Sequence, residues 1–141
     1  IAAAFVIFIP YNTNAEPVSV SDSADLVNHW RFNDGTGNST AVDSSANSNT
    51  GTLTNMEAAG DWSGDVPTSG DSNTSSLDFD GADEYVTVAD PVGGELDVGD
   101  TDDFSLSGWF NRDTETSDDT IIAKRNGQSA TTRSRYVYCL F

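Results

Sequence analysis

The stretch Ser76-Leu77-Asp78-Phe79-Asp80-Gly81-Ala82-Asp83-Glu84-Tyr85-Val86-Thr87-Val88 decides the fold class of this chain. Leu77 and Phe79 alternate with polar residues, and the same alternation returns in Tyr85–Val88. A period of two places successive side chains on opposite faces of a strand. The polar break between the halves contains Gly81, which is typical of a tight turn. The pattern predicts a half-buried antiparallel hairpin.

Further short strands are predicted on both sides of this hairpin, and no segment of useful length has an apolar period of 3.6 residues. The stretches between them, 33–52 and 57–75 above all, are rich in Gly, Asn, Asp, Ser and Thr and are predicted as loops. Many short strands between turn signals indicate an all-β protein. The other predicted strands are Leu26–Phe32, Leu53–Met56, Phe104–Asn111, Thr120–Lys124 and Ser134–Phe141.

Four motifs, in this order, give the chain a family resemblance. They are Trp30-Arg31-Phe32, the loop Asp43-Ser44-Ser45-Ala46-Asn47 that ends at Gly51, Phe79-Asp80-Gly81 leading into Tyr85-Val86, and Phe104-Ser105-Leu106 followed by Trp109. Together they resemble the laminin-G-like, concanavalin A-like domains of secreted proteins, over residues 26 to 123. The resemblance implies an antiparallel jelly-roll β-sandwich. It leaves the ligand open, because this fold hosts many functions.

The charge of the chain narrows the classes of partner. Among 141 residues, 23 are acidic and six are basic, which gives a formal net charge of −17. Such a field repels phosphate backbones and anionic membrane surfaces, so no nucleic acid partner and no membrane insertion of the mature chain are expected. It attracts cations and favours solubility, and a solvated acidic surface without any partner is the alternative interpretation.

The first residues carry features of an export signal. Nine uncharged apolar residues, Ile1–Ile9, are too few to span a bilayer and fit the apolar region of a secretory signal. Thr13-Asn14-Ala15 supplies a cleavage site after Ala15. We therefore expect a partial signal peptide at 1–15, a polar linker at 16–25 and the laminin-G-like domain at 26–141. The alternative for Ile1–Ile9 is an edge strand or a short buried strand.

The last residues bear on completeness and on disulfides. Cys139 is the single cysteine, so no internal disulfide is expected, and its apolar neighbours predict a strand in the core. The chain ends within that apolar run. Because a jelly roll needs further strands to close its sheets, we expect the domain to continue in strands beyond Phe141.

Oxygen-rich side chains point to calcium. The loop Asp43–Gly51 contains Asp43, Asn47 and Asn49 close together, and calcium takes six to eight oxygen ligands from carboxylates, amides and carbonyls. In domains of the family resembled here a structural calcium often lies near such loops, and Asp80 is an additional candidate ligand. The predicted cofactor is a structural calcium bound by Asp43, Asn47, Asn49 and Asp80. The alternative is that these side chains only make turns within their loops.

Aromatic side chains provide the candidate ligand-binding residues. Sugar rings present C–H faces that stack on aromatic planes. Trp109 lies on the opposite face of its predicted strand from Phe104 and Leu106, and Trp62 lies in a predicted loop, so both are candidates for stacking. Trp30 is expected in the core. The alternative for Trp109 is cover by a loop.

No catalytic residue is predicted in this chain. His29 is expected on the surface, because it alternates with the core residue Trp30 and has no second His beside it. Glycoside hydrolases of jelly-roll type carry Glu-x-Asp-x-Glu on one strand, whereas Glu95-Leu96-Asp97-Val98-Gly99 lacks the last acid.

Taken together, these features predict a secreted or cell-surface binding module. Its expected partner is a polysaccharide or another extracellular glycan, or a protein, and the module is expected to belong to a larger adhesin or polysaccharide-degrading protein. The alternative is a structural or adhesive spacer, or a protein-binding domain, without affinity for glycans. Any catalytic domain is expected outside this chain.

Overall fold

The computed structural model describes residues 6–10, 26–57, 59–66, 73–98, 103–111, 120–126 and 135–140. These residues contain no helix, and their strands pair antiparallel, which confirms the all-β expectation. The strands are β1 (Val6–Pro10), β2 (Asn28–Trp30), β3 (Thr40–Ala41), β4 (Gly51–Thr54), β5 (Trp62–Ser63), β6 (Ser76–Leu77), β7 (Tyr85–Val88), β8 (Phe104–Gly108), β9 (Ile122–Asn126) and β10 (Arg135–Leu140).

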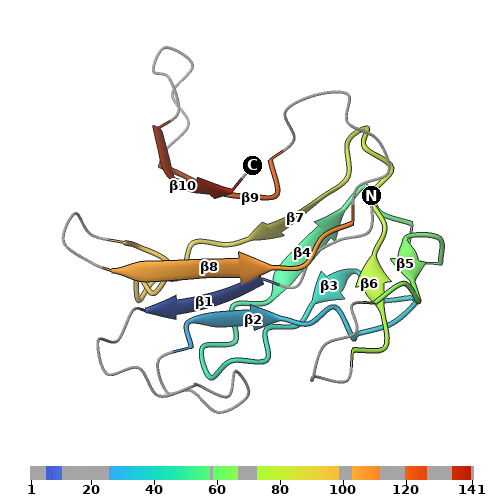
Figure 1. Cartoon of the computed structure of the whole chain (residues 1–141), viewed down its shortest axis with the longest axis horizontal. Helices are drawn as coiled ribbons and strands as arrows, with labels where there is room; N and C mark the ends of the chain where they lie inside the picture. Colours follow the sequence, from blue (N-terminus) through green and yellow to red (C-terminus); the bar gives the residue numbers. More distant parts are fainter. Residues whose placement is uncertain are drawn as a thin grey trace.

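The described strands form small sheets rather than one continuous surface (Figure 1). Two of the sheets have three strands, in the orders β2-β1-β8 and β3-β4-β7, and two have two strands, β5-β6 and β9-β10. A backbone bridge between Trp30 and Asp43 links β2 to the segment that follows β3. This bridge brings the Trp30-Arg31-Phe32 motif against the loop Asp43–Gly51.

The predicted hairpin is wrong in its pairing. β6 pairs with β5, with Leu77 opposite Trp62, whereas β7 pairs with β4, with Val86 opposite Leu53. The polar residues between β6 and β7 form an irregular, mostly exposed loop around Gly81, which has a φ of 77°. Partners from distant parts of the chain bury Leu77 completely, and this burial outweighs the short loop closure that favours a local hairpin.

Close approach of β4 and β7 depends on a glycine. A Cβ added at Gly51 would lie 2.6 Å from Cγ1 of Val86, well inside van der Waals contact. Gly51 is opposite Val88 in the register, so its missing side chain lets two valines of β7 cover this end of β4. Gly51, which ends the loop Asp43–Gly51, is therefore required by packing.

One apolar cluster joins the sheets. Its buried members are Trp30, Phe32, Ala41 and Leu77, and partly buried side chains from several other strands pack against them. The expectation that Trp30 lies in the core is confirmed. The partly buried members are Leu53, Met56, Trp62, Phe79, Val86, Val88, Ile121 and Ile122.

Three further expectations are corrected. His29 is only 3% exposed, because all three residues of β2 are buried and neither face of this strand is left to water. β3 lies within 33–52, and Trp62 begins β5 within 57–75, although both ranges were expected as loops. Strands of two residues are too short for an alternating pattern to reveal them.

The ends of the described chain are also strands. Val6–Pro10 form β1, which is paired on both sides and is therefore not an edge strand. The export signal stays a prediction. Cys139 lies in β10 opposite Ala123 of β9, as expected for a strand residue. Cleavage after Ala15 concerns a site outside the described residues and stays a prediction.

Candidate functional site

The loop Asp43–Gly51, which follows β3, is organised around one buried carboxylate. Asp43 is 5% exposed. Its Oδ1 accepts hydrogen bonds from the main-chain N–H groups of His29 and Ser45, each at 2.8 Å. Its Oδ2 accepts one from Ser45 Oγ and one from the main-chain N–H of Asn49, also at 2.8 Å. Of these four donors, the N–H of His29 ties the loop to β2, and the other three hold the loop to itself.

The two asparagines of the loop bond to β2 and to the residue that precedes it. Asn47 Nδ2 donates to the carbonyl of Val27, and Asn49 Nδ2 donates to Oδ1 of Asn28, both at 2.8 Å. Trp30 Nε1 donates to the carbonyl of Asn49, also at 2.8 Å. The structure thus brings together three of the four predicted calcium ligands, and it engages each of them in bonds within the protein.

Asp80, the fourth predicted ligand, bonds within the loop between β6 and β7. Its Oδ1 accepts from the main-chain N–H of Ala82 at 2.7 Å, and its own N–H donates to Glu84. Burial raises the pKa of Glu84. The hydrogen bond from Asp80 lowers that pKa, but the bond to Asp61 and the charges of both aspartates raise it further, and the net shift is upward. In the part of the chain that the structure describes, no group of three or more His, Cys, Asp or Glu side chains is arranged to hold a metal ion.

The two candidate tryptophans differ in exposure. Trp109 is 54% exposed and the next residue, Phe110, is 53% exposed, so two aromatic side chains stand in water just after β8. Trp62 is partly buried and packs against the core cluster. Along β8 the exposed positions are Ser105 and Ser107, and Trp109 continues this alternation. The surface at this end of β8 therefore combines hydroxyl groups with an exposed indole.

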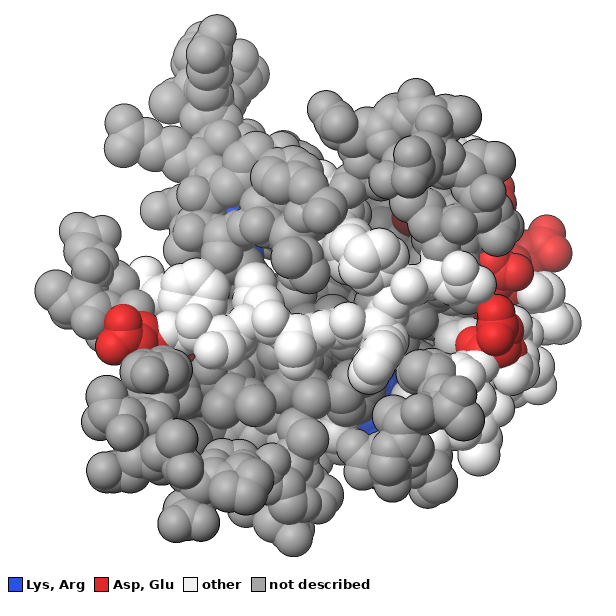
Figure 2. Space-filling view, in the orientation of Figure 1, with Lys and Arg blue, Asp and Glu red and all other residues white. Residues whose placement is uncertain are grey.

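Charge is distributed unevenly over the described surface. Figure 2 shows Asp and Glu side chains at two opposite margins of the face in view, while Lys and Arg reach the surface only in small areas. The white area between the margins consists of uncharged residues. The acidic side chains at these margins would repel anions.

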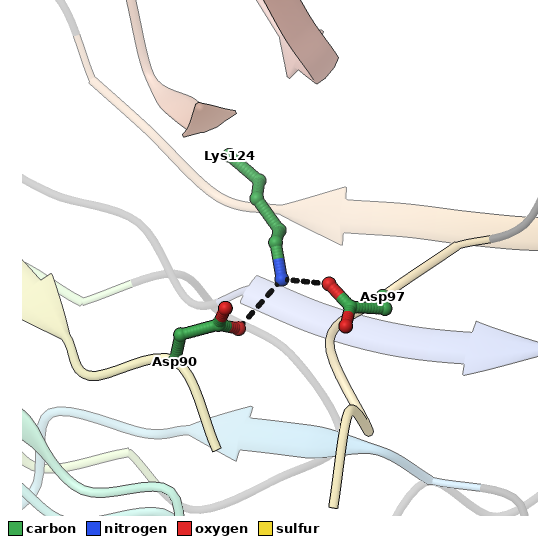
Figure 3. A network of polar contacts seen from close by, with 3 residues as sticks. All are labelled: Asp90, Asp97 and Lys124. Carbon is green, nitrogen blue, oxygen red and sulfur yellow. Dashed lines mark hydrogen bonds and ion pairs between the residues drawn. The ribbon is translucent and has the colours of Figure 1, made fainter. Parts of the chain in front are cut away.

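Lys124 forms ion pairs with the segment that follows β7, and no pattern in the sequence predicts these pairs. Nζ of Lys124, on β9, lies 2.7 Å from Oδ1 of Asp90 and 2.5 Å from Oδ1 of Asp97 (Figure 3). The Lys124 side chain is 14% exposed, while the two carboxylates are mostly exposed. Burial lowers the pKa of Lys124, but the hydrogen bonds and charges of Asp90 and Asp97 outweigh it, and the net pKa is raised above 10.5.

This bridge predicts a loss of stability at high pH. Because the pKa of Lys124 is higher in the folded than in the unfolded chain, its contribution is complete below 10.5 and disappears as the pH rises through the folded value. Lys124→Arg keeps its charge throughout this range. We expect the melting temperature of the natural protein to fall more steeply above pH 10.5 than that of Lys124→Arg. The difference in the free energy of unfolding should be under about 1 kcal/mol, since the aspartates are exposed. Parallel alkaline melting curves would contradict the role of the bridge.

None of the described residues belongs to a helix that could cross a membrane. Comparison of the chain with protein-family models, with curated proteins and with solved structures gave no match.

Proposed function

We propose that this chain is an extracellular binding module that recognises carbohydrate through the surface at the end of β8. The observation that carries the proposal is the exposure of Trp109 next to Phe110, at 54% and 53%. Trp109 and Phe110 are adjacent and both exposed, and contiguous exposed apolar surface is typical of interaction sites. Flat aromatic faces match the C–H faces of sugar rings, and the hydroxyls of Ser105 and Ser107 donate and accept hydrogen bonds as sugar hydroxyls require.

The finer fold class belongs to the same proposal. We propose a jelly-roll sandwich of laminin-G-like type, supported by the four sequence motifs and by the antiparallel pairing of the described strands. An extracellular location is supported by the apolar first residues and by the acidic, soluble composition.

A substitution at Trp109 tests the carbohydrate site. We expect Trp109→Ala to weaken retention on a bound polysaccharide by about 1–3 kcal/mol, by analogy with stacking of nucleic-acid bases on aromatic side chains. The melting temperature should change little, because more than half of this side chain is already in water. Affinity electrophoresis on a panel of soluble polysaccharides, chosen after a broad glycan array, measures the effect.

The matched control is Tyr85→Ala. Tyr85 is also an exposed aromatic residue, at 48%, but it lies on β7 in another sheet. Equal weakening by both substitutions would argue against a site at β8, and weakening by Trp62→Ala alone would move the site to β5. An array without any bound glycan would favour the protein-binding or spacer function instead.

The structural calcium stays a prediction, and the geometry defines what it must displace. All four donors on Asp43 are N–H or O–H groups of the protein, so an ion at this carboxylate has to replace at least one of them. A calcium that binds only the folded chain raises stability by about 2.7 kcal/mol at a hundredfold excess over its dissociation constant. The calcium hypothesis therefore predicts a lower melting temperature in excess chelator than in calcium. Superimposable melting curves would leave the hydrogen bonds of Asp43 as the support of the loop.

A further inference from the structure

The two outer strands of the sheet β2-β1-β8 end at the same point of the register. Val6 of β1 is opposite both Trp30, the last residue of β2, and Gly108, the last residue of β8. Because β2 and β8 are both antiparallel to β1, they run in the same direction and end on the same side of the sheet (Figure 1). The next residues along the chain are Arg31 after β2 and Trp109 after β8, so these two residues follow one cross-strand row.

The register also assigns Arg31 and Trp109 to one face of the sheet. His29 and Ser107 are both opposite Ile7, and residues directly opposite each other point to the same face. Two residues further along each strand the same face recurs, which is the position of Arg31 and of Trp109. Neighbouring strands are about 4.8 Å apart, so the Cα atoms of Arg31 and Trp109 are expected to be about 10 Å apart.

Hydrogen bonds that do not involve β1 hold the same two segments to β6 and to the residues before it. In the segment after β8, Asn111 Nδ2 donates to Oδ2 of Asp65 at 3.3 Å. The carbonyl of Asp65 accepts from Ser76 Oγ, on β6, at 2.7 Å. Three residues before Ser76, Asn73 Nδ2 donates to the carbonyl of Arg31 at 3.3 Å. The chain segments that follow β2 and β8 are thus fastened to one neighbouring region.

Arg31 is a cation without a paired anion in an acidic chain. Its Nε is buried and has no hydrogen-bond partner. The chain has 23 acidic and six basic residues, yet among the described residues the ion pairs are those of Lys124 with Asp90 and Asp97, and none includes Arg31. A buried donor without an acceptor is costly and rare in native proteins. Because Arg31 as a whole is only partly buried, an anion from outside the chain can approach its guanidinium.

We propose that Arg31 binds a carboxylate of the same polysaccharide that stacks on Trp109, so that the ligand is a polysaccharide carrying uronic acids. This inference rests on the carbohydrate site proposed at the end of β8. The planar guanidinium presents paired N–H donors whose geometry matches a carboxylate. The acidic margins of the molecule repel such a ligand at long range, but at about 0.15 M salt charges more than about 8 Å apart are largely screened.

Chemical reduction of the ligand carboxylates tests the inference. The probes are glucuronoxylan, xanthan and alginate, each paired with its carboxyl-reduced form, in affinity electrophoresis of the full chain. We expect the natural protein to be retained about tenfold more strongly on an acidic form than on the matching reduced form. Arg31→Gln should be retained equally on both, at the level of the natural protein on the reduced form. Trp109→Ala should weaken retention on both, because stacking does not depend on the carboxylate.

The matched control for charge is Lys124→Gln. It removes one positive charge from β9, which belongs to another sheet, and should keep the tenfold preference for the acidic form. The melting temperature distinguishes binding from a merely structural role of Arg31. We expect Arg31→Gln to melt no lower than the natural protein, because it removes a buried donor that has no acceptor. A lower melting temperature with an unchanged preference would show that Arg31 serves packing alone.

The outcomes separate this inference from the carbohydrate site itself. Equal retention of the natural protein on acidic and reduced forms, or a preference that survives in Arg31→Gln, would overturn the role of Arg31 without touching that of Trp109. Absence of retention on every probe, acidic or reduced, would overturn the site at Trp109 and this inference with it.

Discussion

Replacing Asp43 with Ala should lower the stability of this protein by about 3 kcal/mol, because one buried and three part-buried hydrogen bonds lose their acceptor at once. The carboxylate accepts from the main-chain N–H groups of His29, Ser45 and Asn49, and His29 is itself 3% exposed. An alanine methyl group accepts no hydrogen bond, and a main-chain N–H buried without an acceptor costs its full desolvation penalty. Urea unfolding of Asp43→Ala against the natural protein measures the change.

Two control variants separate this network from general effects of charge. Asp80→Ala also removes one negative charge and a bond to a main-chain N–H, but its loop is exposed, so we expect a change within about 0.5 kcal/mol. Asp43→Asn keeps the shape of the side chain but replaces one acceptor oxygen by an amide N–H₂ that faces other donors. Its loss of stability should lie between those of Asp80→Ala and Asp43→Ala. Equal losses in Asp43→Ala and Asp80→Ala would refute a special role for the buried carboxylate.

The contacts of Asp43 could be predicted only in part from the sequence. The oxygens of Asp43, Asn47 and Asn49 suit calcium, and the structure gathers these residues in one loop. Turn formation by these side chains, which was the alternative, is seen directly in the bond from the N–H of Ser45 to Asp43. Proximity within a short loop can be read from spacing. The bond that Asp43 accepts from His29 of β2 cannot be read in this way, since it depends on a contact 14 residues away in the chain.

Pairing over long distances limited the fold prediction in the same way. The positions of β7 and β8 follow from alternation, but nothing in residues 76–88 says that β6 prefers β5 and β7 prefers β4. The Lys124 bridge was missed for a related reason. Asp90 and Asp97 are two of many aspartates in an acidic chain, and only their shared approach to one amino group distinguishes them.

The pairing of β6 with β5 predicts a large effect at Leu77. This side chain is fully buried in the core cluster, and its Cα is opposite that of Trp62. Leu77→Ala removes three carbon atoms from a packed site and should cost about 2–5 kcal/mol, which combines the lost transfer free energy with the cavity left behind. Val92→Ala, at a fully exposed position, should change stability by less than about 0.5 kcal/mol.

A double-mutant cycle makes this prediction specific to the observed pairing. Directly opposed residues on antiparallel strands have neighbouring side chains, so the effects of Leu77→Ala and Trp62→Ala should not add. We expect a coupling of at least about 0.5 kcal/mol for this pair and none for Leu77→Ala with Tyr85→Ala, since Tyr85 is opposite Thr54 in another sheet. If Leu77 coupled to Tyr85 and not to Trp62, the local hairpin first expected from the sequence would be the better description. Urea unfolding of the single and double variants distinguishes the two pairings, because only the observed register sets Leu77 opposite Trp62.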